Sequence, residues 1–116
     1  MGRAVTAMLE DDLQAAVIDL ARMLGWLVYH THDSRHSGKG FPDLVMCHPR
    51  SGALLFAELK SVTGRVTPEQ DEWLRALAVR GVAFLWRPEH LRDGSIVRAL
   101  QRYAATVPPV TTPDAP

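Results

Sequence analysis

Apolar residues recur in the first part of the chain at the spacing of one face of an α-helix. The recurring positions, at steps of four, four, three and four, are Leu9, Leu13, Val17, Leu20 and Leu24. This pattern predicts an amphipathic helix from about Met8 to Leu24. Thr6 is the expected N-cap, and Gly25 is expected to end the helix in a left-handed conformation.

Three stretches rich in β-branched, aromatic and other apolar residues follow and predict strands over residues 26–31, 41–47 and 53–60. A polar segment with two glycines, residues 32–40, separates the first two strands and is expected to be a loop. Only a five-residue turn, 48–52, separates the second strand from the third. These two strands are therefore expected to pair antiparallel.

A second helix begins at Thr67, where proline follows at the first helical position and Gln70 completes a capping box. The helix is expected to run to Arg80 and to end at Gly81. The uninterrupted apolar run 82–86 is typical of a strand buried on both faces. Residues 89 to about 103 predict a last helix with a candidate exposed stripe for self-association. The stripe comprises Ile96, Leu100 and Tyr103.

The resulting order, α-β-β-β-α-β-α, predicts a mixed α/β domain in which helices flank a mixed sheet. A chain of 116 residues is long enough for one such core and too short for two. We therefore expect a single domain over residues 1–104. Four prolines fall between residues 105 and 116, which predicts a loose C-terminal tail.

The composition limits the cellular locations and the classes of binding partner that are expected for the protein. Hydrophobic residues make up 47% of the chain and no apolar stretch is long enough to span a bilayer, which excludes a membrane protein. The absence of an apolar segment before Glu10 and the single cysteine, Cys47, predict a cytoplasmic protein. Thirteen basic residues balance thirteen acidic ones, which argues against a protein that binds nucleic acid by net charge alone.

Candidate chemistry lies on the second and third strands. Glu58 and Lys60 are two residues apart in an apolar strand and project from one face, where burial of charge is costly. Pairing of the two strands would bring Asp43 beside Glu58. Two carboxylates so placed repel one another unless a divalent cation such as Mg²⁺ lies between them. Glu10 flanks the buried face of the first helix, from which its side chain could reach the sheet.

These residues occur in a recognisable order. The segment from Gly40 to Val45 contains Pro42-Asp43, fourteen residues separate Asp43 from Glu58, and Glu58-Leu59-Lys60 follows. The chain thus resembles the PD-(D/E)xK nuclease superfamily. More narrowly, it resembles the VRR-NUC branch, which is common in phages and related to Holliday-junction resolvases. Glu10 and Gln70 match a helix glutamate and a glutamine that this branch also shows.

The resemblance, which covers roughly residues 9–88, implies a restriction-endonuclease-like α-β-β-β-α-β core and a DNA endonuclease. Asp43, Glu58 and the backbone carbonyl of Leu59 would hold Mg²⁺ or Mn²⁺, with Glu10 in support. Lys60 would activate the attacking water or neutralise charge on the phosphate, and Gln70 would position Lys60 or the phosphate. A phage-encoded protein would act in the cytoplasm of its host.

Polar and basic residues near the site are expected to contact phosphates rather than to recognise bases. This group comprises His32, Ser34, Arg35, Lys39 and Arg65. We therefore expect selectivity for branched, junction or flap DNA rather than for a base sequence. Junction-cleaving relatives work as dimers, and a homodimer is left open here. The rival hypothesis is a catalytically silent or partner-dependent nucleic-acid-binding module with the same fold.

Less specific interpretations exist for several of these residues. Asp43, Glu58 and Lys60 could form an exposed ion pair on an edge strand, and Glu10 could serve the helix dipole. Gln70 could act in capping only, and capping is compatible with a catalytic role. Zinc binding is disfavoured for the histidines at 30, 32, 36 and 48, because Cys47 has no partner cysteine. The three tryptophans are expected in the core rather than as base-stacking platforms.

Overall fold

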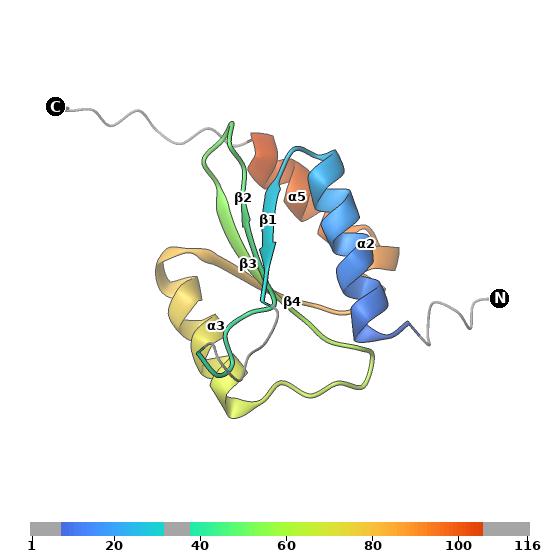
Figure 1. Cartoon of the computed structure of the whole chain (residues 1–116), viewed down its shortest axis with the longest axis vertical. Helices are drawn as coiled ribbons and strands as arrows, with labels where there is room; N and C mark the ends of the chain where they lie inside the picture. Colours follow the sequence, from blue (N-terminus) through green and yellow to red (C-terminus); the bar gives the residue numbers. More distant parts are fainter. Residues whose placement is uncertain (1–7, 32–37, 106–116) are drawn as a thin grey trace, which may run out of the picture.

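A computed structural model describes residues 8–31 and 38–105 of the chain. A four-stranded sheet lies at its centre, with helices on both faces (Figure 1). The elements follow in the order α2 (Glu10–Met23), β1 (Leu27–His30), β2 (Leu44–Cys47), β3 (Leu54–Leu59), α3 (Pro68–Arg80), β4 (Val82–Trp86), α4 (Pro88–Arg92) and α5 (Ser95–Ala105). The predicted mixed α/β fold is confirmed. In the described residues, no helix has the length and apolar character needed to cross a bilayer.

The strands lie in the sheet in the same order as in the chain, β1-β2-β3-β4. As predicted, β2 and β3 pair antiparallel, with Leu44 opposite Ala57. This register continues to Asp43 and Glu58, the next residues toward that end of the sheet. Strands β3 and β4 pair parallel, because α3 carries the chain back between them. The site residues therefore lie where β2 begins and β3 ends.

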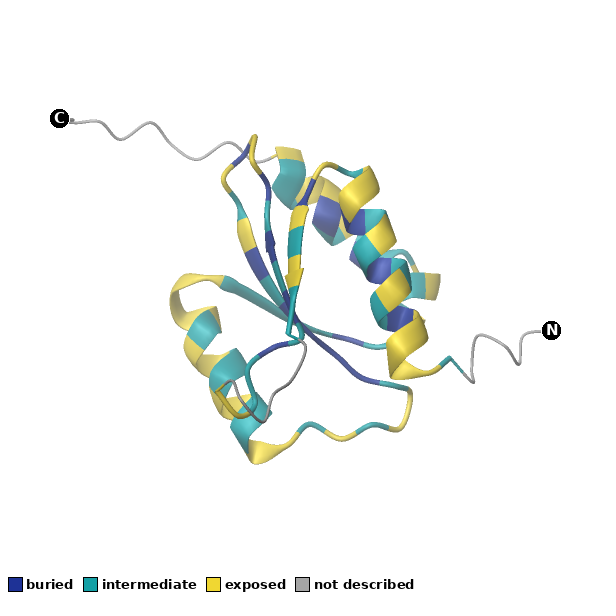
Figure 2. Ribbon diagram, viewed as in Figure 1, coloured by how far each residue is buried: buried dark blue, intermediate teal, exposed yellow. Residues whose placement is uncertain are grey.

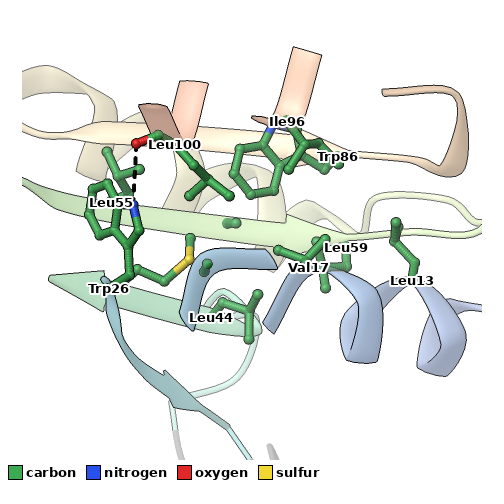
Figure 3. Close-up of a cluster of buried hydrophobic side chains, with 12 residues drawn as sticks. Leu13, Val17, Trp26, Leu44, Leu55, Leu59, Trp86, Ile96 and Leu100 are labelled. Carbon is green, nitrogen blue, oxygen red and sulfur yellow. Dashed lines mark hydrogen bonds between the residues drawn. The ribbon is translucent and has the colours of Figure 1, made fainter. Parts of the chain in front are cut away.

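Alternation along the strands divides the side chains between the two faces of the sheet. One face, with α2 and α5 over it, holds a fully enclosed core (Figures 2 and 3). Trp26 contributes to this core and donates a hydrogen bond from its indole Nε1 to the carbonyl of Leu100 at 3.2 Å. Trp26 and Trp86 are both 3% exposed, so the expectation that they pack in the core is confirmed. For Trp73 it is wrong, because that side chain is only half-buried and lies outside this core.

Helix α2 begins three residues later than an N-cap at Thr6 would place it. The N-cap position is Leu9, whose side chain makes no capping hydrogen bond. The prediction for Thr6 is therefore wrong, and Thr6 itself lies outside the described residues. The acidic first turn of α2 offsets the missing cap by favourable interaction with the helix dipole. At the other end, Gly25 adopts the predicted left-handed conformation, with φ +92°.

The last predicted helix is in fact two, α4 and α5, separated by Asp93 and Gly94. Gly94 has φ +84°, and Asp93 accepts hydrogen bonds from Ser95, so the chain turns here and starts a new helix. The turn directs Ile96 and Leu100 into the core, where both are 0% exposed. The prediction of an exposed stripe for self-association is therefore wrong, because this stripe is the buried face of α5.

Strand β4 is less enclosed than its apolar sequence predicts. It forms an edge of the sheet, and only Trp86 among its residues is buried. Helix α3 covers the second face of the sheet lightly, since none of its residues is fully buried. The predicted burial on both faces is therefore wrong. The tail predicted from residue 105 lies, from residue 106 on, outside the described residues.

Candidate active site

Asp43 and Glu58 converge at the end of the β2–β3 pair, as the sequence predicts. Asp43 lies directly before β2, and its Oδ2 accepts a hydrogen bond from the backbone N–H of Leu59 at 2.8 Å. This bond joins the two strands beyond their last paired residues and fixes the Asp43 carboxyl beside the Glu58 carboxyl. The two acidic residues, which fourteen residues separate in the sequence, thus share one location.

Glu58 and Lys60 form a buried pair on the same face of the sheet. Glu58 is 1% exposed and Lys60 is 9% exposed. The Oε2 atom of Glu58 lies 3.6 Å from Nζ of Lys60. The other oxygen, Oε1, is buried and has no hydrogen-bond partner among the described residues. An exposed ion pair on an edge strand is therefore excluded, and one carboxylate oxygen is left to accept a ligand.

The pKa values of the carboxyls reflect this crowding. Burial, and then the negative charge of Asp43, raise the pKa of Glu58 to about 8 although Lys60 opposes the shift. Burial also raises the pKa of Asp43, against the Leu59 N–H and Lys60, which both lower it. When ionised, the two carboxyl groups carry more negative charge than Lys60 alone neutralises, and this excess favours the binding of an additional cation.

Glu10 lies within electrostatic reach of the pair, on the exposed first turn of α2. Its pKa is raised, first by partial burial and then by the charge of Asp43, while Lys60 lowers it. The Glu10 carboxyl on α2 therefore interacts electrostatically with both Asp43 and Lys60. In residues 8–31 and 38–105, however, no group of three or more His, Cys, Asp or Glu side chains is arranged to hold a metal ion. Glu10 thus lies at the periphery of the Asp43–Glu58 pair.

The approach of the chain to Asp43 depends on a glycine that touches α3. Gly40 has φ +88°, and a Cβ atom there would lie 2.5 Å from the carbonyl carbon of Glu69. The neighbouring carbonyl of Lys39 accepts a hydrogen bond from the indole Nε1 of Trp73 at 3.1 Å. Phe41 packs edge-on against the same indole. Helix α3 thereby supports the segment that places Asp43.

Gln70 forms the predicted capping box at the start of α3. Its Oε1 accepts a hydrogen bond from the N–H of Thr67 at 2.9 Å, and its own N–H donates to Oγ1 of Thr67 at 3.1 Å. The capping role is confirmed. Within the described segments, these bonds join Gln70 to Thr67 rather than to Lys60, so a role beside Lys60 stays a prediction.

Two of the five residues expected to contact phosphates are described. Lys39 has a side chain that is 81% exposed, with Nζ at 3.8 Å from Oε2 of Glu69. Arg65 is exposed in the segment between Lys60 and α3. Three further residues of this prediction lie outside the described residues: His32, Ser34 and Arg35.

His48 has a structural role at the opposite end of β2. Its Nδ1 accepts a hydrogen bond from the N–H of Arg50 at 3.3 Å, so the proton lies on Nε2, 3.0 Å from the carbonyl of Leu24. The ring also packs edge-on against Trp26. Both ring nitrogens of His48 are thus engaged in hydrogen bonds with backbone groups of the protein. Of the other histidines weighed for zinc, His32 and His36 lie outside the described residues.

Arg87, which no sequence pattern indicates as part of the site, lies beside the segment that follows Lys60. The sequence indicates its role only weakly, because Arg87 is simply an arginine directly after an apolar strand. Only the parallel pairing of β4 with β3 brings Arg87 near Lys60.

Comparisons with known proteins agree with this geometry. The model of the VRR-NUC domain family matches residues 4–86. A solved structure described as a VRR_NUC domain protein superimposes with a TM-score of 0.60, covering 90% of this chain and 98% of that chain. At 18% sequence identity, the superposition shows a common fold. A search of curated proteins found no match.

Proposed function

The chain belongs to the VRR-NUC domain family, and on this premise we propose that it is a metal-dependent endonuclease that hydrolyses phosphodiester bonds in DNA. Family membership implies a nuclease fold and nuclease activity in general. The single observation that carries the finer proposal is the buried cluster of Asp43, Glu58 and Lys60. Glu58 has a buried carboxylate oxygen without a hydrogen-bond partner among the described residues, and a second carboxyl group lies beside it. This arrangement destabilises the folded protein unless a ligand binds there.

The donor atoms of this cluster fit a hard divalent cation. Carboxylate and carbonyl oxygens suit Mg²⁺ and Mn²⁺, and the raised pKa values of both acids indicate that a cation would be favoured between them. We assign the ligands to Asp43, Glu58 and the backbone carbonyl of Leu59, with Glu10 supporting from α2. When bound, the cation supplies Lewis-acid stabilisation of charge on the phosphate.

We assign to Lys60 the direct role in catalysis, at the attacking water and the scissile phosphate. Its ammonium, held 3.6 Å from Glu58, is a fixed positive charge that orients the attacking water, assists its deprotonation and stabilises charge on the scissile phosphate. Gln70 keeps its Oε1 in the capping box. Its amide nitrogen is the group we assign to positioning Lys60 or the phosphate.

We assign recognition to the phosphate backbone and the shape of the DNA. Lys39 and Arg65, together with His32, Ser34 and Arg35, are the proposed phosphate contacts. Because the net charge is zero, broad electrostatic attraction to duplex is weak. Branched, junction or flap DNA, which offers a distinctive shape, is therefore the proposed substrate class. A homodimer presenting two sites to two strands is part of the same proposal, as is a location in the cytoplasm.

The test is cleavage of labelled four-way junction, flap, single-stranded and duplex DNA with Mg²⁺, with Mn²⁺ and with chelator. Wild type is compared with Lys60→Ala, and Arg80→Ala, an exposed residue at the end of α3, is the matched control. We expect metal-dependent cleavage that Lys60→Ala abolishes and Arg80→Ala retains. Cleavage that survives Lys60→Ala would refute the assigned site. Absence of cleavage by wild type on every substrate would favour a silent or partner-dependent binding module.

A further inference from the structure

Arg87 gathers the backbone carbonyls of one turn around a single guanidinium nitrogen. Its Nη1 lies 2.7 Å from the carbonyl oxygen of Ser61 and 2.8 Å from that of Gly64. The carbonyl of Val62 lies at 3.4 Å. Within the turn, the N–H of Gly64 donates to the carbonyl of Ser61 at 3.3 Å. From its position directly after β4, Arg87 thus holds the turn of residues 61–64.

This turn lies directly against the Lys60 side chain. A Cβ atom on Gly64 would stand 3.3 Å from Cδ of Lys60 and 3.1 Å from Oγ of Ser61, so the glycine backbone packs on the lysine stem. The backbone of Lys60 is fixed separately, because its N–H donates to the carbonyl of Trp86 at 3.0 Å. Lys60 is therefore held by two consecutive residues, the last of β4 and the one that follows it. Trp86 holds its backbone, and Arg87 holds the turn that covers its side chain.

Among the residues that the structure describes, few other interactions restrain the turn. Residues 60–67 belong to no helix or strand, and Val62, Thr63 and Arg65 are exposed. Charge-assisted hydrogen bonds are about twice as strong as neutral ones, and here they converge on a half-buried cation. The order of the turn consequently depends on the Arg87 guanidinium.

We propose that Arg87 is a positioning residue for Lys60: by holding the turn of residues 61–64, it keeps the Lys60 stem packed and the ammonium beside Glu58. The catalytic consequence rests on the function proposed above, whereas the structural consequence does not. Loss of the guanidinium would free the turn, expose Lys60 and let its ammonium leave the acidic pair.

The two lysines of the chain permit a direct measurement that needs no enzymatic activity. Lys60 is 9% exposed, whereas the side chain of Lys39 is 81% exposed. Brief acylation with acetic anhydride, followed by mass spectrometry of the peptides, gives the ratio of Lys60 to Lys39 labelling. We expect Arg87→Gln to raise this ratio at least about fivefold, because the variant removes the charged donor. Arg87→Lys, which retains a cationic donor, should raise it less.

Two further variants complete the design. Gly64→Ala presses on the Lys60 stem without altering Arg87, and it should also change the labelling ratio. Arg92→Gln, an exposed arginine on α4, is the matched control and should leave the ratio unchanged. Circular dichroism melts verify that each variant is folded. An unchanged ratio in folded Arg87→Gln would overturn the inference, as would a ratio raised equally in Arg87→Gln and in the control Arg92→Gln.

Steady-state cleavage then tests the catalytic consequence. We expect Arg87→Gln to lower kcat by about 10- to 100-fold with little change in KM, because a misplaced catalytic group costs turnover rather than binding. Arg87→Lys should recover part of the loss. An unaltered kcat despite raised Lys60 labelling would overturn the positioning role. If wild type does not cleave any substrate, the proposed function fails, and the labelling ratio still decides whether Arg87 places Lys60.

Discussion

Replacement of Glu58 by glutamine in the metal-free protein should change how stability depends on pH. Below about pH 4.5, both the folded and the unfolded chain hold a proton on Glu58. As the pH rises, the unfolded chain releases this proton, while the folded chain retains it until about pH 8. The folded state therefore binds more protons over this interval, and the free energy of unfolding falls as the pH rises. Glu58→Gln removes the titrating group, so its stability should decline much less.

The size of the effect follows from the raised pKa. A shift from 4.5 to about 8, at about 1.4 kcal/mol per unit, gives a loss of about 3 to 4 kcal/mol between pH 5 and pH 8. Asp43 and Glu10, whose pKa values are also raised, add a smaller loss of the same sign that the variant retains. Since a domain of this size has a total stability of about 5 to 15 kcal/mol, the loss is large.

Urea denaturation followed by circular dichroism, with chelator at pH 5, 6, 7, 8 and 9, measures this difference. Glu72→Gln, an exposed acid on α3, is the control and should follow wild type. Wild-type and Glu58→Gln stabilities that remain parallel within about 0.5 kcal/mol from pH 5 to pH 8 would refute the reasoning. Added Mg²⁺ should stabilise wild type at pH 8 and stabilise Glu58→Gln much less, because a ligand that binds only the folded state raises its stability.

Three further predictions concern stability and are checked by the same denaturation assay. Gly40→Ala should destabilise the fold by about 2 to 4 kcal/mol, because the added Cβ would collide with the backbone of α3 and because the residue has a positive φ. Gly38→Ala is the control, and equal losses of stability in the two variants would contradict the argument. Leu100→Ala should cost about 2 to 5 kcal/mol through a cavity in the core, whereas a loss no larger than that of exposed Val79→Ala would be inconsistent with its burial. Thr67→Ala should cost about 1 kcal/mol by removing the cap of α3, and an effect no greater than that of Thr63→Ala would argue against the capping box.

The parts of the fold that local patterns specify were predictable. The capping box at Thr67 and Gln70 occurs where the residue types predict it, because capping requires only neighbours in sequence. The convergence of Asp43 and Glu58 was also predictable, since a short hairpin fixes the register and alternation fixes the face.

The features that were missed depend on contacts between distant segments or on a single residue. Gly94 fits within a helical pattern, and its positive φ appears only in the folded chain. The stripe containing Ile96 is apolar whether it is covered by this chain or by a second copy, and only the packing of α5 beside α2 decides between them. The hydrogen bonds of Arg87 go to backbone carbonyls, which have no residue-type signature in a sequence.

The order of the strands in the sheet has a consequence for how the domain folds. Each strand pairs with its neighbour in sequence, so the β2–β3 hairpin closes only a short loop, at small entropic cost. Helix α5, in contrast, contacts residues far away in the sequence, such as Trp26, which lies 74 residues before its hydrogen-bond partner Leu100. We expect the hairpin to be structured in the folding transition state and α5 to dock later. The repulsion between Asp43 and Glu58 would then oppose folding at its slowest step. A divalent cation bound by this pair should therefore accelerate folding of this chain more than it slows unfolding.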